Sequence, residues 1–338
     1  MAKPLHEPGV TVDGFRLEEL IHQGGMAALW RVSRPEATMP LLMKVPRIGE
    51  GADPAAIVSF EMEQMIMPRL SGPHVPAFVA AGDFSAQPYI VMEAIPGDTL
   101  LRRLDALPLP YDEVAALGGN IATALHDLHG QHVIHLDVKP SNIMLRPSGE
   151  AVMLDYGLAR HDQLPDLMRE EFRVPFGTAP YMSPEQLRGI RDDPRSDLFA
   201  LGVLLYFFST GERPFGEAES LGGMRRRLWR DPIPPRALRA DYPPWLQEIV
   251  LRCLEVEPAW RYPTAAQLAF ELGHPDRVTL TRRSERLRRD HKTAPTTSAA
   301  TMMIATTIQP VWVIVLLPQR GRGTTTFGGG RRCMEKAA

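Results

Sequence analysis

The chain of 338 residues is long enough for one two-lobed domain with a tail or for two small domains, and its hydrophobic content of 44% excludes general disorder. Its net charge of −2 and pI of about 6.6 give no electrostatic case for nucleic acid as a partner. Its cysteines, Cys253 and Cys333, cannot build a disulfide framework and suit a reducing cytosol. Residues 1–10 contain no apolar stretch typical of a secretory signal, so a cytoplasmic location is expected.

The N-terminal part of the chain predicts a small β-rich lobe. Residues 1–14 are expected to form an arm. Residues 15–92 alternate strand-like runs with one helical run, which begins at Phe60 and continues through Leu70. A strand over residues 88–93 leads into Ala-Ile-Pro-Gly, so residues 93–98 are predicted to form a hinge between lobes.

The central part of the chain, residues 99–274, is predicted to be mostly helical. Residues 114–128 have the apolar spacing of a buried helix, and residues 200–208 are apolar all round, as expected of a central helix. The two parts together predict an α+β fold with a small β-rich N-lobe and a larger helical C-lobe.

Two short polar segments carry the chemistry. Residues 135–142 read His-Leu-Asp-Val-Lys-Pro-Ser-Asn, and residues 155–157 read Asp-Tyr-Gly. Asp137 can take a proton from a hydroxyl nucleophile, and Lys139 can neutralise charge on a moving phosphoryl group. Asn142 and Asp155 offer hard oxygens to Mg²⁺, which prefers a few such ligands together with phosphate.

These segments resemble the H-R-D-x-x-x-x-N catalytic loop and the D-F-G motif of Hanks-type protein kinases, and the style of the loops is similar to the bacterial serine/threonine kinases. The resemblance runs from about Phe15 to about Gly273 and implies the two-lobed protein kinase fold, with Phe60 opening helix αC. Other family landmarks follow in the expected order: Leu41–Lys44, Phe60–Glu63, Gly177–Glu185, Ser196–Gly202 and Arg261.

The resemblance implies a role for several single residues. Lys44 would hold the α- and β-phosphates of ATP, with Glu63 as its ion-pair partner and Glu61 as the competing choice. Thr178 would brace the catalytic Asp137 and Lys139. Arg261 falls where the family places the partner of the A-P-E glutamate, which is Glu185 here.

The nucleotide pocket is also implied by the resemblance. Of the phosphate-covering loop, residues 21–27, two glycines remain, while His22 and Ala27 replace the outer ones. The hinge backbone would bind the adenine edge, and apolar side chains would enclose the ring. The implied cofactors are ATP and Mg²⁺, with Asn142 and Asp155 as the metal ligands. The expected nucleotide-binding residues are Ile21, Gly24, Gly25, Leu29, Leu42, Lys44, Glu93, Ile95, Met144 and Asp155.

The activation loop departs from the family pattern. Leu136 replaces the arginine that meets a phosphate on this loop, and no Ser, Thr or Tyr occurs between Gly157 and Gly177. We therefore expect internal ion pairs to order the loop, between basic and acidic residues that lie near one another: Arg160, Arg169 and Arg173 with Asp162, Asp166, Glu170 and Glu171. The basic run Arg225–Arg227 is expected to be a solvated face, with a docking site for acidic segments as the alternative.

Residues 275–338 are predicted to form a basic linker and tail. Residues 293–319 carry no charge, and this stretch is longer than the ~20 apolar residues of a membrane helix. It is only moderately apolar, and basic residues flank both sides. A strand that opens a truncated further α/β domain, a membrane anchor through about 299–317 and a loose tail all remain open.

The resemblance predicts ATP- and Mg²⁺-dependent phosphorylation of Ser and Thr in proteins, including the chain itself. Lys139 and Thr178 are typical of the Ser/Thr class. The alternatives are a nucleotide-binding pseudokinase scaffold, motivated by the eroded glycine loop, and a small-molecule kinase with the same Asp-to-Asn spacing. No nucleic acid partner is expected, and the sequence leaves the oligomeric state open.

Overall fold

The protein is described by a computed structural model for residues 7–48, 53–172, 175–216 and 224–286. Within these ranges, no helix combines the length and the apolar character needed to cross a membrane. The uncharged stretch over 293–319, with its predicted strand, anchor or tail, lies outside the described residues.

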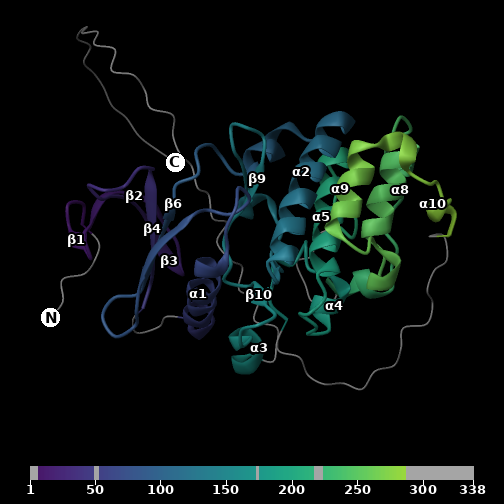
Figure 1. Cartoon of the computed structure of the whole chain (residues 1–338). Helices are drawn as coiled ribbons and strands as arrows, with labels where there is room; N and C mark the ends of the chain where they lie inside the picture. Colours follow the sequence, from purple (N-terminus) through teal and green to yellow (C-terminus); the bar gives the residue numbers. More distant parts are fainter. Residues whose placement is uncertain (1–6, 49–52, 173–174, 217–223, 287–338) are drawn as a thin grey trace, which may run out of the picture.

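The small lobe (Figure 1) is built on an antiparallel sheet. The sheet has six strands in the order β1-β2-β3-β4-β6-β5. Alternating side chains of these strands bury one face in a core around Trp30, which is 1% exposed. The strands are β1 (Thr11–Val12), β2 (Phe15–Gln23), β3 (Ala27–Ser33), β4 (Leu41–Pro46), β5 (Phe78–Gly82) and β6 (Tyr89–Glu93).

One long helix, α1 (Pro54–Ile66), belongs to the small lobe, and the short 3-10 helix η1 (Met67–Arg69) follows it. The Asp53 side chain caps α1 by accepting a hydrogen bond from the Ala55 amide at 2.9 Å, and proline occupies the first turn. The inner face of α1 buries Glu63 among apolar side chains. A buried carboxylate requires a partner, which the sheet provides.

The large lobe is helical (Figure 1). Helix α2 (Tyr111–Gly130) packs against α5 (Arg195–Thr210) and α9 (Ala265–Gly273), and α8 (Pro244–Cys253) packs on α5. Helix α5 is buried nearly all round and ends at Gly211, whose φ of +79° forms a left-handed C-cap. The predicted two-lobed α+β fold is confirmed.

The remaining elements of the large lobe are short. Two antiparallel strand pairs, β7 with β10 and the hairpin of β8 with β9, carry the polar segments of the cleft. These strands are β7 (Val133–Ile134), β8 (Ile143–Leu145), β9 (Ala151–Met153) and β10 (Arg160–His161). The short helices are η2 (Leu100–Ala106), η3 (Pro140–Asn142), α3 (Leu167–Glu171), α4 (Pro184–Leu187), η4 (Arg226–Leu228), α7 (Pro235–Leu238), η5 (Pro258–Trp260), η6 (Pro275–Arg277) and α10 (Arg283–Arg286).

Two segments outside the predicted domain, residues 15–274, contact it in the structure. Within the predicted N-terminal arm, Thr11–Val12 is a strand of the sheet, and Asp13 accepts a hydrogen bond from the Tyr89 hydroxyl at 2.6 Å. Beyond residue 274, Arg283 in α10 forms ion pairs with Glu248 and Glu255, so the chain stays on the large lobe as far as residue 286. Contacts with distant strands and helices fix both segments, and composition alone does not reveal such contacts.

Candidate active site

A cleft between the lobes holds most of the predicted site. It encloses about 740 Å³, including the space open to solvent. Predicted residues that line it are Leu29, Leu42, Lys44, Glu63, Glu93, Ile95, Asn142, Met144 and Asp155. Ile21 packs beside the cleft, against Leu29, Leu42 and Ala94.

The two predicted loop glycines do not line this cleft. Gly24 and Gly25 lie in the turn between β2 and β3, where the Gly24 amide donates to the Ala27 carbonyl at 3.0 Å. The Arg47 guanidinium donates to the Gly24 carbonyl at 3.2 Å, which ties the turn to the end of β4. The neighbouring residues Met26 and Ala27 line a second hollow that adjoins the catalytic residues.

Lys44 bridges two acidic groups in the cleft. Its Nζ lies 2.5 Å from Glu63 Oε2 and 3.2 Å from Asp155 Oδ1. The pair therefore involves Glu63, whose side chain is 2% exposed, and not Glu61. Burial alone lowers the pKa of Lys44, but the carboxylates of Asp155 and Glu63 outweigh it and hold this pKa above its ordinary value. The lysine is therefore a fixed cation in the cleft.

Asp155 comes directly after the β8–β9 hairpin, in a left-handed conformation with φ of +63°. Burial raises the pKa of its carboxyl, but the charges of Lys44 and Lys139 lower it further, so the pKa is below its ordinary value and the group is ionised. A Cβ atom on Gly157 would collide with the Ser59 hydroxyl of α1, so glycine allows this close approach without displacing that side chain. Tyr156 lies between them in sequence and packs its ring 5.5 Å from that of His135.

The catalytic-loop residues form one hydrogen-bonded group. Lys139 Nζ lies 2.7 Å from Asp137 Oδ2 and donates to Thr178 Oγ1 at 2.9 Å. Thr178 Oγ1 donates in turn to Asp137 Oδ1 at 2.7 Å, across 41 residues of sequence. Asn142 Nδ2 donates to Asp137 Oδ2 at 2.9 Å and to its backbone oxygen at 3.0 Å. Both oxygens of the Asp137 carboxylate are therefore held in place.

Asp197, a buried aspartate at the start of α5, holds the backbone of the catalytic loop. Asp197 accepts hydrogen bonds from the backbone amides of His135 at 2.9 Å and Leu136 at 2.8 Å, and its carboxylate also contacts His129 Nε2 at 2.8 Å. Leu136 has a φ of +60°, which is costly for a non-glycine residue. The Gln186 side chain donates to its carbonyl at 2.8 Å. These bonds hold the strained turn that presents Asp137.

In the described part of the activation loop, Asp166 forms an ion pair other than the predicted ones, and Arg173, one of the predicted partners, lies outside the described residues. Asp166 caps α3, accepting from the Arg169 amide at 3.3 Å, and its Oδ2 accepts from Arg191 Nε at 2.9 Å. Arg191 also donates to the Leu158 carbonyl at 3.0 Å. Both side chains of the pair are at least nine-tenths buried. The prediction of internal pairing is therefore wrong for Asp166, because its partner comes from the segment after α4.

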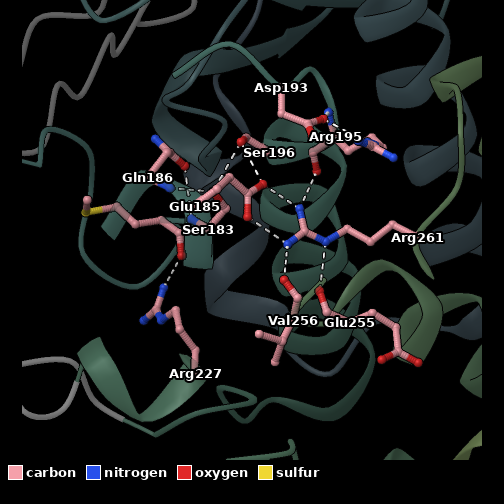
Figure 2. Close-up of polar contacts among 11 residues, drawn as sticks. Ser183, Glu185, Gln186, Asp193, Arg195, Ser196, Arg227, Glu255, Val256 and Arg261 are labelled. Atoms are coloured by element: carbon pink, nitrogen blue, oxygen red, sulfur yellow. Dashed lines mark hydrogen bonds and ion pairs between the residues drawn. The ribbon is translucent and has the colours of Figure 1, made fainter. Parts of the chain in front are cut away.

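The end of the activation segment is anchored by buried arginines (Figure 2). Arg261 donates to both carboxylate oxygens of Glu185, at 2.6 and 2.8 Å, as the resemblance implies. Arg227 is 1% exposed, so the prediction of a solvated basic run is wrong for this residue. Its guanidinium donates to the carbonyls of Pro180 and Met182, and burial lowers its pKa to about 10.

Several lining residues were not predicted from the sequence. They are Met67, Pro76, Met92, Ser141, Leu154 and Tyr156. Most are chain neighbours of predicted residues, and Met67 lies four positions after Glu63, on the same face of the helical segment. Pro76 gives no such signal, because the tertiary fold alone brings its loop to the cleft.

A sheet lobe and a helical lobe that meet at a cleft with an anchored lysine and a braced aspartate define a protein of the kinase class. The model of the protein kinase domain family matches residues 15–271, and the chain belongs to this family.

Two curated relatives and one solved structure are similar to this chain, in agreement with its membership of the protein kinase family. The chain is 35% identical over 277 residues to the serine/threonine-protein kinase pkn3 of Myxococcus xanthus, covering 78% of this chain and 50% of that protein. It is 32% identical over 266 residues to the serine/threonine-protein kinase PknB of Mycolicibacterium smegmatis, covering 77% and 42%. The crystal structure of the Mycobacterium tuberculosis PknI kinase domain shares the fold, with a TM-score of 0.61, 24% identity and coverage of 80% and 99%. The chain spans about half the length of the curated relatives it matches.

Proposed function

We propose that this chain transfers the γ-phosphoryl group of ATP to Ser and Thr hydroxyls of proteins, itself included. One observation carries the proposal: Lys44, Asp137 and Asp155 line a single hollow beside the cleft. This hollow thus brings together a cation that can bind phosphate, a carboxylate that can accept a proton from a hydroxyl, and a carboxylate that can bind a metal ion. Phosphoryl transfer requires such positioning and charge neutralisation, and little covalent chemistry from the protein.

Asp137 would orient the acceptor hydroxyl and take its proton as the oxygen attacks phosphorus. Thr178 and Lys139 hold the carboxylate for this task, and Lys139 also balances negative charge on the moving group. Lys44 would hold the α- and β-phosphates, with Glu63 fixing its position. Backbone groups of Glu93 and Ile95 would meet the adenine edge, and Ile21, Leu29, Leu42 and Met144 would enclose the ring.

Asn142 and Asp155 would hold Mg²⁺. The ionised carboxylate of Asp155 and the amide of Asn142 line the same cleft and present hard oxygens, so the residues fit this ion. The ion would neutralise phosphate charge during transfer. Gly24 and Gly25 would cover the phosphates from the turn between β2 and β3.

Protein substrates with Ser or Thr acceptors are favoured because Lys139 and Thr178 form the group typical of that class, and because pkn3 and PknB carry the name of serine/threonine-protein kinases. A pseudokinase scaffold is less well supported, since all four of Lys44, Asp137, Asn142 and Asp155 are present around the cleft. A small-molecule kinase is disfavoured by the Glu185–Arg261 anchor. A cytoplasmic location remains a prediction from the sequence.

The test is to incubate the purified chain with labelled ATP, Mg²⁺ and a generic protein substrate, and to map the phosphosites. Asp137→Asn keeps the shape of the side chain but removes the proton acceptor. We expect phosphotransfer to fall by at least about a hundredfold, because general-base catalysis contributes ~10²–10⁴-fold, while nucleotide still binds. Asp155→Asn should instead weaken binding of the Mg²⁺–nucleotide complex. Unchanged phosphotransfer by the Asp137 variant would refute the proposal.

A further inference from the structure

Arg146 of the large lobe forms an ion pair with Glu93 at the hinge between the lobes. Arg146 lies directly after β8, and Glu93 is the last residue of β6, where the chain leaves the small lobe. Arg146 Nη1 and Nη2 donate to Glu93 Oε1 and Oε2 at 2.6 and 2.9 Å. The two side chains are 20% and 17% exposed. Two parallel charge-assisted bonds of this kind fix direction as well as distance, which a single ion pair does not.

The same arginine reaches a second segment of the small lobe. Its Nε donates to the Pro73 carbonyl at 2.9 Å, in the loop that leads from η1 to β5. Within that loop, the Ala77 amide donates to Glu93 Oε2 at 3.2 Å, and the Glu93 amide donates to the Ala77 carbonyl at 2.9 Å. One guanidinium thus joins β8, the hinge and the loop that follows the helix bearing Glu63.

One partner of the ion pair lines the cleft and the other does not. Glu93 and Met144 line the cleft, whereas Arg146, two positions beyond Met144, does not. A change at Arg146 would therefore act on a bound nucleotide through Glu93 and the backbone that the ion pair holds.

We propose that Arg146 is a positioning residue that locks the hinge to the large lobe and thereby sets the affinity for nucleotide. The proposal rests on the proposed function, because it takes the backbone of residues 93–95 as the binding surface for the adenine edge. An unlocked hinge samples more conformations, and ordering it on binding costs affinity. Hinge residues characteristically control domain closure in this way.

The experiment compares Arg146→Ala and Arg146→Lys with wild type and with a matched control, Arg252→Ala. Arg252 forms a similarly buried ion pair with Glu271 at 3.4 Å between α8 and α9, with 27% and 15% exposure, far from the hinge in sequence. The readouts are the Kd for Mg²⁺–ADP by calorimetry, KM and kcat for phosphorylation, and hydrogen exchange of the Glu93 and Ala77 amides without nucleotide.

We expect Arg146→Ala to raise the Kd and the KM for ATP about tenfold, which corresponds to ~1.4 kcal/mol and is close to the lower end of what a charge-assisted hydrogen bond contributes, with kcat changed less than about twofold. The Kd and the KM of Arg146→Lys should lie between those of wild type and Arg146→Ala, because lysine keeps the charge but cannot form the two parallel hydrogen bonds. Exchange of the Glu93 amide should accelerate in Arg146→Ala. Arg252→Ala should lower stability and leave the Kd and this exchange unchanged.

An unchanged Kd in a folded Arg146→Ala protein, or an equal rise in Arg252→Ala, overturns the proposal and leaves Arg146 as a structural brace. If Arg146→Ala does not fold, the Kd and the amide exchange of Arg146→Lys decide the outcome. An Arg146→Lys protein whose Kd and Glu93 amide exchange equal those of wild type overturns the proposal. Wild-type protein that binds Mg²⁺–ADP without transferring phosphate refutes the proposed function alone. Wild-type protein that binds no nucleotide refutes both.

Discussion

Removing Arg261 should destabilise the large lobe more than any exposed arginine does. The guanidinium is fully buried and donates to both oxygens of Glu185 (Figure 2). It also donates to the carbonyls of Arg195 at 2.9 Å, Glu255 at 2.8 Å and Val256 at 3.1 Å. Arg261→Ala would leave the Glu185 carboxylate buried without its counter-charge and three carbonyls without this donor.

The magnitude follows from that burial. Breaking a buried ion pair by deleting one partner costs ~3–5 kcal/mol, because an uncompensated charge stays behind. Water that enters the space left by the side chain would satisfy some of the carbonyls, so we expect a loss of about 4 kcal/mol rather than a larger sum. Such a loss is a large fraction of the ~5–15 kcal/mol that stabilises a typical domain.

Urea denaturation followed by tryptophan fluorescence would measure the loss, with Arg277→Ala as the control. Arg277 pairs with Asp276 on the surface, with side chains 70% and 75% exposed, and its loss should cost under ~1 kcal/mol. The double variant with Glu185→Ala should be markedly less than additive, because the stranded carboxylate is removed. A loss for Arg261→Ala no larger than that of the control would refute this reasoning.

Three further predictions concern the cleft, the loop and the hinge. A double-mutant cycle on Lys44 and Glu63 should be strongly non-additive in kcat/KM, because the atoms lie 2.5 Å apart and are buried, and additive losses would contradict their action as a unit. Phosphatase-treated wild type should phosphorylate substrate without a lag, since we expect the Asp166–Arg191 ion pair rather than a phosphate to order the activation loop. Asp166→Asn should lower the rate of substrate phosphorylation about fivefold, because it removes the charge of this pair. A lag abolished by prior incubation with ATP would disprove this account of the loop. The difference in free energy of unfolding between wild type and Arg146→Ala should shrink in acid, because the hydrogen bond from Arg146 lowers the pKa of Glu93 in the folded protein. The stabilisation from this pair is complete above the pKa of ~4.3 that Glu93 has in the unfolded chain. It is lost as the pH falls through the lower pKa of Glu93 in the folded protein. A difference that stays constant from neutral pH to about pH 3 would show that another interaction is responsible.

Short-range sequence patterns determine much of the candidate site. Asp137, Lys139 and Asn142 lie within six positions of one another, so the chain itself keeps them close, although bonds from Thr178 and Asp197 fix their geometry. The fold class follows from the change between strand-like and helical periodicity, which reflects the side-chain spacing of each element. Glu61 and Glu63 are alternatives in the sequence because both lie on the same helix, α1, two positions apart. Packing distinguishes them, since only Glu63 faces the buried side where Lys44 lies.

The sequence by itself therefore determined the residue types, their order and the family they indicate. The tertiary structure decided which charges meet. Asp166 pairs with Arg191 across 25 positions, and Arg146 with Glu93 across 53. Nothing local distinguishes these arginines from exposed ones such as Arg277, because any guanidinium can pair with any carboxylate. The partner is selected when the backbone buries both groups at the same place, and only the folded chain specifies that place.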